Sequence, residues 1–179
     1  MASLYSLLGG GITYVAVKEL QNFQIIRKNG LSRREYRFIR KNLKEAKHKI
    51  SRLRRALYRV RSLSQAKQNL EIYQTVRKIY ANTQKEPKRF FQAERFYYKN
   101  LDSLVELTEK HAFLSSQPAK SKEMITTLTE TRHMISGLSD SINKDLQVML
   151  DNDMDTLHFE LDVAKQSMKK IDKHDRRVF

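Results

Sequence analysis

The spacing of apolar residues between positions 36 and 60 constrains the fold of this chain more than any other feature of its sequence. Apolar side chains follow one another there at alternating steps of three and four residues, at Tyr36, Ile39, Leu43, Ala46, Ile50, Leu53, Leu57 and Val60. This spacing is typical of an α-helix that packs one face into a bundle or coiled coil. The other faces of this helix are strongly basic, so only one face is available for a core.

The signals that start this helix are clear. Gly30 interrupts the preceding segment, and Ser32 and Glu35 have the spacing of a capping box. Leu31 and Tyr36 can form a hydrophobic staple across the same turn. The sequence therefore predicts a boundary near residue 31, with an apolar, membrane-proximal segment and basic linker over 1–30 and a helical domain over 31–179.

Two more helices follow in the pattern. The second is expected after Ser62 to Gln65 and before Pro87, because the residue preceding a proline is steered away from helical geometry. The residues expected to face its core are Leu70, Tyr73, Val76 and Tyr80. The third is expected from near Lys88, through a cluster of aromatic residues, towards Leu114.

The last part of the chain has helical spacing over its whole length. From about residue 119 the predicted inward positions are Met124, Leu128, Thr131, Ile135, Leu138 and Ile142, and after a shift near Leu146 they resume as Leu157, Leu161, Ala164, Met168 and Ile171. This segment forms either one helix of about 50 residues, roughly 75 Å long, or two helices that meet at a bend in residues 151–153.

Composition supports the same fold class. Only five glycines and two prolines occur, too few for the turns of a many-stranded sheet, and the absence of cysteine excludes disulfides, thiolate metal sites and cysteine nucleophiles. We therefore predict an all-α fold. Its expected architecture is an elongated antiparallel helical bundle with coiled-coil-like seams and a short apolar N-terminal segment.

The positive charge is concentrated in one half of the chain. Residues 1–100 carry 24 Lys and Arg against 6 Asp and Glu, a net charge of +18, whereas residues 101–179 carry 11 against 14, a net charge of −3. Fifteen of the basic residues lie between Arg27 and Arg61. A dense basic segment next to an apolar one is typical of the cytoplasmic side of a membrane protein.

The apolar N-terminus itself has no charged side chain from Ala2 to Val17. As a helix these residues would span about 24 Å, against a hydrocarbon core of roughly 30 Å. We interpret them as a membrane segment, complete or partial. The alternatives are a frayed tail and an apolar helix buried in an oligomer.

Two groups of residues are candidate binding sites. Arg52, Arg55 and Arg59 recur at helical steps and can bind a phosphate or a lipid headgroup, although on a helix this basic a solvated or lipid-facing surface explains them better than a phosphate site does. Phe91, Tyr97 and Tyr98 can contact an aromatic ligand such as an indole, but aromatic residues at helical spacing are usually core residues.

Residues for catalysis or metal binding are not apparent. No two histidines have the four-residue spacing of a shared metal, and the aspartates of residues 151–155 match neither a calcium loop nor an aspartate-dependent phosphatase. Ser115 and Ser116 lie one turn from His111 but have no glycine nearby to form an oxyanion hole. We therefore predict no metal and no cofactor.

Four stretches resemble a known family. Residues 86–98 read EPKRFFQAERFYY, residues 101–118 read LDSLVELTEKHAFLSSQP, and the later stretches ETR (130–132) and FELDVAK (159–165) add to them. Over roughly residues 30–169 the chain closely resembles the bacterial XpaC family, which is named for hydrolysis of 5-bromo-4-chloroindolyl phosphate. The resemblance implies a membrane-associated protein, often encoded beside TelA-like toxic anion resistance proteins. It provides no catalytic residues to assign.

Three functions stay open at this stage. The first is a membrane-associated scaffold whose basic helix lies on anionic lipid and which acts with a partner such as a TelA-like protein or a second copy of the chain. The second is the phosphate ester hydrolase that the family name implies. The third, nucleic-acid binding through the basic helix, is permitted by the charge but supported by no motif.

Overall fold

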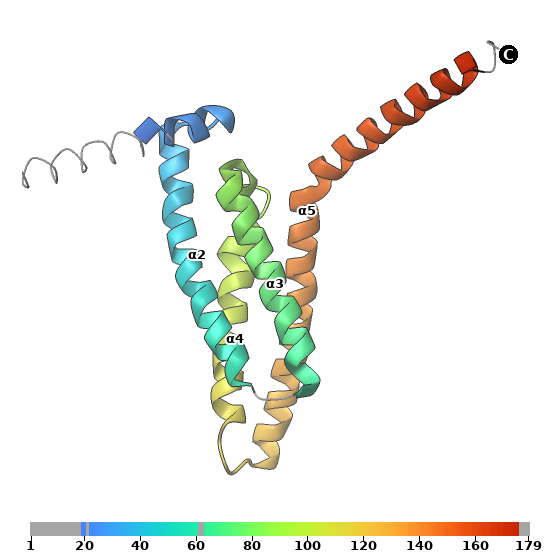
Figure 1. Cartoon of the computed structure of the whole chain (residues 1–179). Helices are drawn as coiled ribbons and strands as arrows, with labels where there is room; N and C mark the ends of the chain where they lie inside the picture. Colours follow the sequence, from blue (N-terminus) through green and yellow to red (C-terminus); the bar gives the residue numbers. More distant parts are fainter. Residues whose placement is uncertain (1–18, 21, 61–62, 176–179) are drawn as a thin grey trace, which may run out of the picture.

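The computed structural model describes residues 19–20, 22–60 and 63–175. Its long helices are α2 (Arg33–Arg59), α3 (Leu63–Lys85), α4 (Leu101–Ser115) and α5 (Lys122–Asp175), and residues 22–28 form a short helix before α2 (Figure 1). A 3-10 turn, η1 (Pro87–Phe90), and a π-helical turn, η2 (Phe96–Asn100), connect α3 to α4. The described residues contain no β-strand, so the predicted all-α fold is confirmed.

The four long helices form an elongated bundle in which consecutive helices run in opposite directions (Figure 1). Helix α3 nevertheless lies beside α5, and these two are parallel. Gln68 Nε2 donates to Ser136 Oγ at 3.1 Å and Thr75 Oγ1 donates to Asn143 Oδ1 at 3.0 Å, and the residues of both pairs are 68 positions apart. A constant separation of this kind occurs only between parallel helices in register. The structure thus adds parallel pairs to the antiparallel order expected from the sequence.

Helix α2 packs on α3 and α4, and helix α5 packs on the same two helices. The helices α3 and α4 therefore lie on a diagonal of the bundle. Residues 86–100 therefore have to cross the end of the bundle to connect them. Their aromatic side chains fill this end: Phe90 and Phe96 are fully buried, and Tyr97 is only 5 % exposed. The third predicted helix accordingly does not begin at Lys88, which lies in η1, and helical structure resumes only at residue 94.

The start of α2 has the predicted capping box. Ser32 Oγ accepts from the Glu35 amide at 3.1 Å, and Glu35 Oε2 accepts from the Ser32 amide at 2.7 Å. Gly30 has a φ of 61°, in the left-handed region that glycine tolerates best. The predicted helix start is confirmed, while the division into segments 1–30 and 31–179 stays a prediction.

The predicted core face is correct for α2 and partly wrong for α3. Of the predicted α2 positions, all except Val60 are buried. On α3, Val76 is fully buried but Leu70 is 51 % exposed, and Ile72, Ile79 and Thr83 are the other core residues of that helix. The reason is that α3 packs against both α2 and α5. Its buried face lies between these two contacts and is therefore rotated around the helix relative to the predicted stripe.

Helix α5 is a single helix of 54 residues, which resolves the choice between one helix and two. Its core residues Leu128, Ile135, Ile142 and Met149 are buried. Beyond Met149, α5 bends away from the bundle and leaves it (Figure 1). The later positions that were predicted to face the core are therefore exposed, namely Leu157, Leu161, Ala164 and Met168. That prediction is wrong for this chain alone, and the side chain of Ile171 lies outside the described residues.

The predicted membrane segment over residues 2–17 also lies outside the described residues. Among the helices that the structure does describe, none is long and apolar enough to cross a membrane.

Candidate functional site

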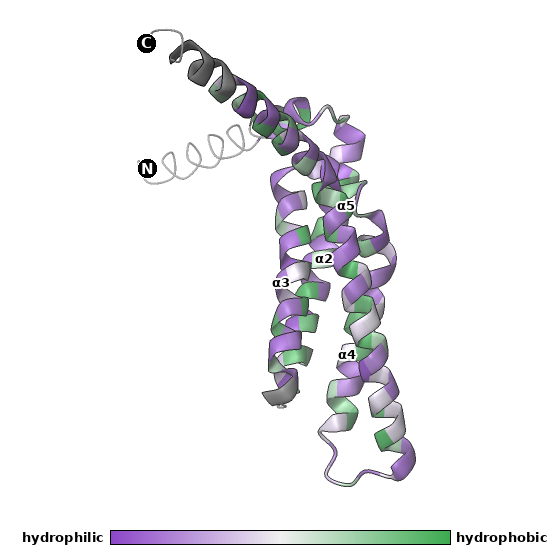
Figure 2. Cartoon of the chain, turned by 90° about the vertical axis from the view of Figure 1, so that its right-hand side faces the viewer, coloured by the Kyte–Doolittle hydropathy of each residue, from purple (hydrophilic) through white to green (hydrophobic). Residues whose placement is uncertain are grey.

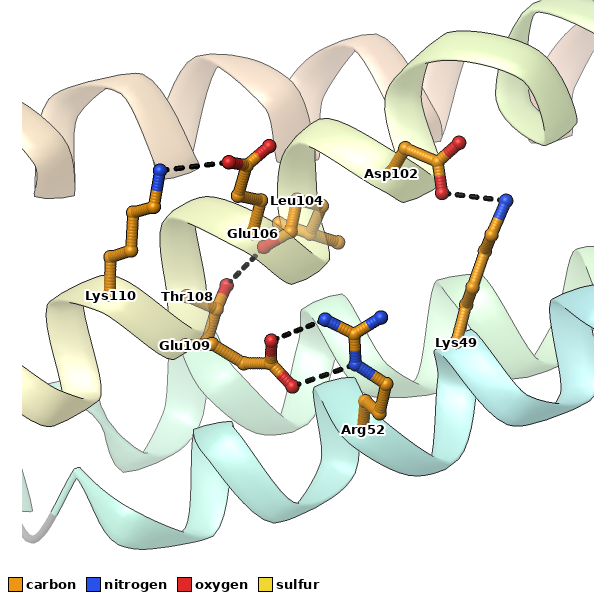
Figure 3. A network of polar contacts seen from close by, with 8 residues as sticks. All are labelled: Lys49, Arg52, Asp102, Leu104, Glu106, Thr108, Glu109 and Lys110. Carbon is orange, nitrogen blue, oxygen red and sulfur yellow. Dashed lines mark hydrogen bonds and ion pairs between the residues drawn. The ribbon is translucent and has the colours of Figure 1, made fainter.

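The side of α2 that faces α4 has its positive charge neutralised. Lys49 Nζ lies 2.7 Å from Asp102 Oδ1 and 2.7 Å from Glu45 Oε1. Arg52 makes a two-bond pair with Glu109, from Nε at 3.0 Å and from Nη2 at 2.6 Å (Figure 3). Because α2 and α4 are parallel, the acids of α4 follow the bases of α2 in the same order along both helices.

The ionisation of these groups reflects their pairing. The hydrogen bond from Arg52, with additional attraction to that arginine, to Arg55 and to Arg59, lowers the pKa of Glu109. Burial lowers the pKa of the Lys49 ammonium, but hydrogen bonds and attraction to Asp102 and Glu45 outweigh burial, so the net pKa of Lys49 is raised. This side of α2 is therefore part of the structure that holds the bundle together.

The side of α2 that faces α3 is different. A groove runs there between α2, α3 and the short helix of residues 22–28, and we call it the basic groove. Its charged residues are all cationic: Arg40, Lys41, Lys44 and Lys47. Its floor and its opposite wall are formed by Ile25, Tyr36, Ile39, Leu43, Tyr80, Gln84 and Pro87.

Tyrosine side chains fix the shape of the basic groove. Tyr36 Oη donates to Asn22 Oδ1 at 3.1 Å, which attaches the short helix of residues 22–28 to α2. Arg40 Cζ lies 5.9 Å from the centre of the Tyr36 ring, within the range of a cation–π contact. Burial raises the pKa of the Tyr80 hydroxyl, and attraction between its phenolate form and Arg40 offsets only part of that rise.

Three cations of the basic groove have no acidic partner among the residues that the structure describes. Within the described part of the chain, no salt bridge includes Arg40, Lys44 or Lys47, whereas Lys49 and Arg52 on the other side of the helix are both paired. Unpaired cations around a concave surface attract an anion, and Arg40 can bind it through two N–H groups at once. The groove is thus suited to bind a phosphate-bearing group.

The residues that line this groove include no histidine, aspartate or glutamate. The described part of the chain contains no cluster of histidine and acidic side chains that could hold a metal ion. His111, the histidine next to Ser115, lies in α4, which packs on the other side of α2.

The structure describes all three arginines for which we predicted phosphate or headgroup binding. Arg52 is paired with Glu109, while Arg55 and Arg59 are exposed and near enough to contribute to the field at Glu109. A phosphate that binds Arg52 through Nε and Nη2 would have to replace Glu109. Binding by these three arginines stays a prediction.

The three predicted aromatic contacts surround the buried ring of Phe90. Tyr97 stacks on this ring with centroids 4.7 Å apart, and Phe91 and Tyr98 meet it edge-on at 5.9 Å. Tyr97 is a core residue, whereas Phe91 and Tyr98 are 41 % and 48 % exposed. Contact of this cluster with an aromatic ligand stays a prediction.

His111 and Ser115 are neighbours, as the sequence suggested. His111 Nδ1 lies 3.4 Å from Ser115 Oγ, and that hydroxyl also donates to the carbonyl oxygen of His111. Burial, and to a lesser extent repulsion from Arg132, lowers the pKa of His111, so the ring is neutral near pH 7. The serine bonds to its own helix backbone, so this pair has the arrangement of a buried polar contact in α4.

The acidic residues near position 151 also have a structural role. Arg89 binds Asp153 through two hydrogen bonds of 2.8 Å, Glu86 through one of 2.8 Å, and the carbonyl oxygen of Met149 at 3.1 Å. Its hydrogen bond with Asp153 is the main reason that the pKa of Asp153 is lowered. These contacts attach α5 to the crossing connection at the point where α5 leaves the bundle.

The sequence reading missed Arg40, Lys44 and Lys47 as a group. They lie at steps of four and three beside the core stripe of α2, and this spacing was available as a signal. The sequence does not show, however, which flank of the stripe is covered by the acids of α4 and which is left open. That distinction depends on the parallel packing of α2 on α4.

Comparisons with known proteins bear on the family of this chain rather than on its architecture. The family described as "5-bromo-4-chloroindolyl phosphate hydrolysis protein" matches residues 1–164. The chain belongs to this family. It is 48 % identical to Protein XpaC of Bacillus subtilis (strain 168) over 170 residues, which cover 95 % of this chain and 83 % of that protein. The resemblance to the XpaC family seen in the sequence is thereby confirmed, and no solved structure matches the chain.

Proposed function

We propose that this XpaC-family chain works at the cytoplasmic surface of the bacterial cell membrane, where its basic groove binds the phosphate groups of anionic lipids. The observation that carries the proposal is the contrast between the two sides of α2. Lys49 and Arg52 are paired with acids of α4, whereas Arg40, Lys44 and Lys47 line an open groove.

The position of the groove in the chain adds support. It lies at the end of α2 that follows the basic linker, and a neighbouring hollow beside residues 22–28 adds Arg33 and Arg37, with Glu19 as its one acidic residue among those described. The apolar residues 2–17 precede this region in the sequence. An apolar segment followed by a polybasic surface provides two membrane signals, and two signals are needed for stable attachment.

The proposal predicts that neutralising the groove weakens membrane binding. Near an anionic surface each lysine or arginine contributes about 1 kcal/mol, so the triple change Arg40→Gln, Lys44→Gln and Lys47→Gln removes about 3 kcal/mol, or roughly a hundredfold in the partition coefficient. The measurement is sedimentation of the full chain with vesicles of anionic phospholipid and, in parallel, with vesicles of neutral phospholipid. The loss is expected only with the anionic vesicles.

A matched control has the same change in net charge. Arg54→Gln, Lys78→Gln and Lys99→Gln neutralise three exposed cations that lie outside the groove and outside the three arginines predicted from the sequence. This variant is expected to retain most of the binding. An equal loss in both variants would mean that total charge decides the affinity and would contradict a role for the groove.

A second candidate function comes from the comparisons. The description of the matched family refers to hydrolysis of 5-bromo-4-chloroindolyl phosphate. We propose, as the alternative, that the basic groove binds the phosphate of an aryl phosphate ester and that the chain takes part in its hydrolysis.

The scaffold interpretation, with a TelA-like protein as the proposed partner, needs no such activity and agrees with membrane binding.

The test of hydrolysis uses the full chain purified from a host without its own phosphatases, with indolyl phosphate as substrate and with or without added divalent metal ions. The alternative predicts turnover that follows the protein through two different columns and falls in the folded triple groove variant. If purified protein has no turnover, or if the groove variant turns over as fast as the unchanged chain, hydrolysis at this groove is wrong.

A further inference from the structure

The outer part of α5 is a helix without a partner in this chain. Met149 is the last fully buried residue of α5, and every side chain described from Asp151 to Met168 is exposed. Figure 1 shows this part projecting away from the other helices, and Figure 2 shows green, apolar positions interleaved with purple, polar ones along it. A long helix that is exposed on all sides is stable when another helix covers its apolar face.

That apolar face is a regular stripe. It consists of residues at alternating steps of four and three: Leu150, Met154, Leu157, Leu161, Ala164 and Met168, continued in the sequence by Ile171. Four of its large side chains are between 45 % and 67 % exposed, namely Met154, Leu157, Leu161 and Met168. These seven positions are the a and d positions of three heptads and the first such position of a fourth, the pattern of a two-stranded coiled coil.

The stripe does not extend the core face of the bundle. The core residues of α5 are spaced by seven, at Leu128, Ile135, Ile142 and Met149, and the next position in that series is the polar Thr156. The outer stripe instead includes Leu157, one residue further on, which turns it by about 100° around the helix. The outer stripe therefore faces a different direction from the core and needs a different partner.

We infer that this partner is the same segment of a second copy of the chain, packed antiparallel. The charge along the segment favours this orientation. Residues 151–162 carry five acidic side chains and no Lys or Arg, whereas residues 163–173 carry four lysines and one aspartate. Antiparallel packing brings the acidic part of each copy beside the basic part of the other, and parallel packing would bring like charges together.

The register of the pair follows from the stripe. With the twofold axis between Asp162 and Val163, Leu161 faces Ala164 of the second copy, Leu157 faces Met168, and Met154 is level with position 171. The a positions of one helix then meet the d positions of the other along about 26 Å of helix. Such a contact is self-complementary, as a twofold dimer requires, and it leaves the two bundles at opposite ends.

The first test is the mass of the full chain in detergent solution by light scattering. The unchanged chain is expected at twice its mass of 21.2 kDa at micromolar concentrations. The double change Leu157→Asp and Leu161→Asp is expected to raise the dimer dissociation constant at least roughly tenfold, because it puts charges into two layers of the seam. Both residues are exposed in the single chain, so the bundle should keep its helical circular dichroism.

Phe159→Asp provides the matched control. Phe159 is 71 % exposed but lies off the stripe, so this variant is expected to remain a dimer. A monomeric unchanged chain would overturn the inference. A dimer that persists in the double aspartate variant would also overturn it, because the contact would then be made elsewhere, and so would loss of the dimer in both variants.

Cysteine cross-linking tests the orientation, and the chain has no cysteine of its own to interfere. In the antiparallel pair, Leu157→Cys combined with Met168→Cys gives a disulfide-linked dimer, while Leu157→Cys alone leaves its sulfur atoms about 16 Å apart along the axis. Within one helix the two positions are equally far apart, so no disulfide forms inside a chain. Efficient linkage through the single cysteine would indicate parallel packing and overturn the antiparallel arrangement.

Discussion

Replacing Phe90 by alanine is expected to lower the free energy of unfolding by about 3–5 kcal/mol. Phe90 is fully buried where the connection between α3 and α4 crosses the end of the bundle. Its ring meets Phe38 of α2 at 5.9 Å and stacks on Tyr97 at 4.7 Å. Truncation would leave a cavity between α2 and the crossing connection. The measurement is equilibrium unfolding in urea, followed by circular dichroism.

Phe113→Ala is the control for this prediction. Phe113 is an aromatic residue of α4 but is 66 % exposed, so its truncation is expected to cost about 0.5 kcal/mol or less. If Phe90→Ala were no more destabilising than Phe113→Ala, the crossing connection would not be part of the cooperative core.

Replacing Asp145 by alanine is expected to cost about 2–3 kcal/mol, because it leaves polar partners without an acceptor. Asp145 is 4 % exposed and accepts from Arg95 Nε at 2.7 Å and from Asn100 Nδ2 at 2.5 Å. Asn100 also donates to Ser141 Oγ at 3.1 Å. Asn100 ends the π-helical turn η2, whose wider backbone brings this side chain to α5.

Asp140→Ala is the matched control, since Asp140 is an exposed aspartate of the same helix. Its loss is expected to change the free energy of unfolding by no more than about 0.5 kcal/mol. The measurement is the free energy of unfolding of both variants in urea. A decrease of less than about 1 kcal/mol for Asp145→Ala would mean that water replaces the carboxylate at this site.

The two sides of α2 show how a bundle can give one basic helix two roles. Asp102 and Glu109 of α4 bind Lys49 and Arg52, so that side contributes to packing. The other side keeps Arg40, Lys44 and Lys47 open, and the proposed membrane function depends on them. A count of charges along the chain does not show which cations of α2 are paired with acids and which line the groove.

Local signals of the sequence predicted the local structure well. The Ser32 and Glu35 capping box, the core stripe of α2 and the end of α3 before Pro87 all depend on neighbouring residues in the chain, and all three were correct. The face of α3 was only partly correct, since Leu70 is exposed and Ile72 is buried. That face depends on two helices that are distant in the sequence.

The sequence by itself determined that the chain is helical, where α2 begins and where α3 ends, that its positive charge lies in the first half, and that it belongs with the XpaC family. These properties follow from residue spacing and composition, which act over a few turns of helix. The tertiary structure alone decided that α2 lies beside α4 and α3 beside α5, and therefore that Arg40 is open while Arg52 is paired. It also decided that the stripe around Leu157 and Leu161 is exposed. Helical periodicity gives the face that packs but not its partner, because partner choice depends on contacts between residues far apart in the chain.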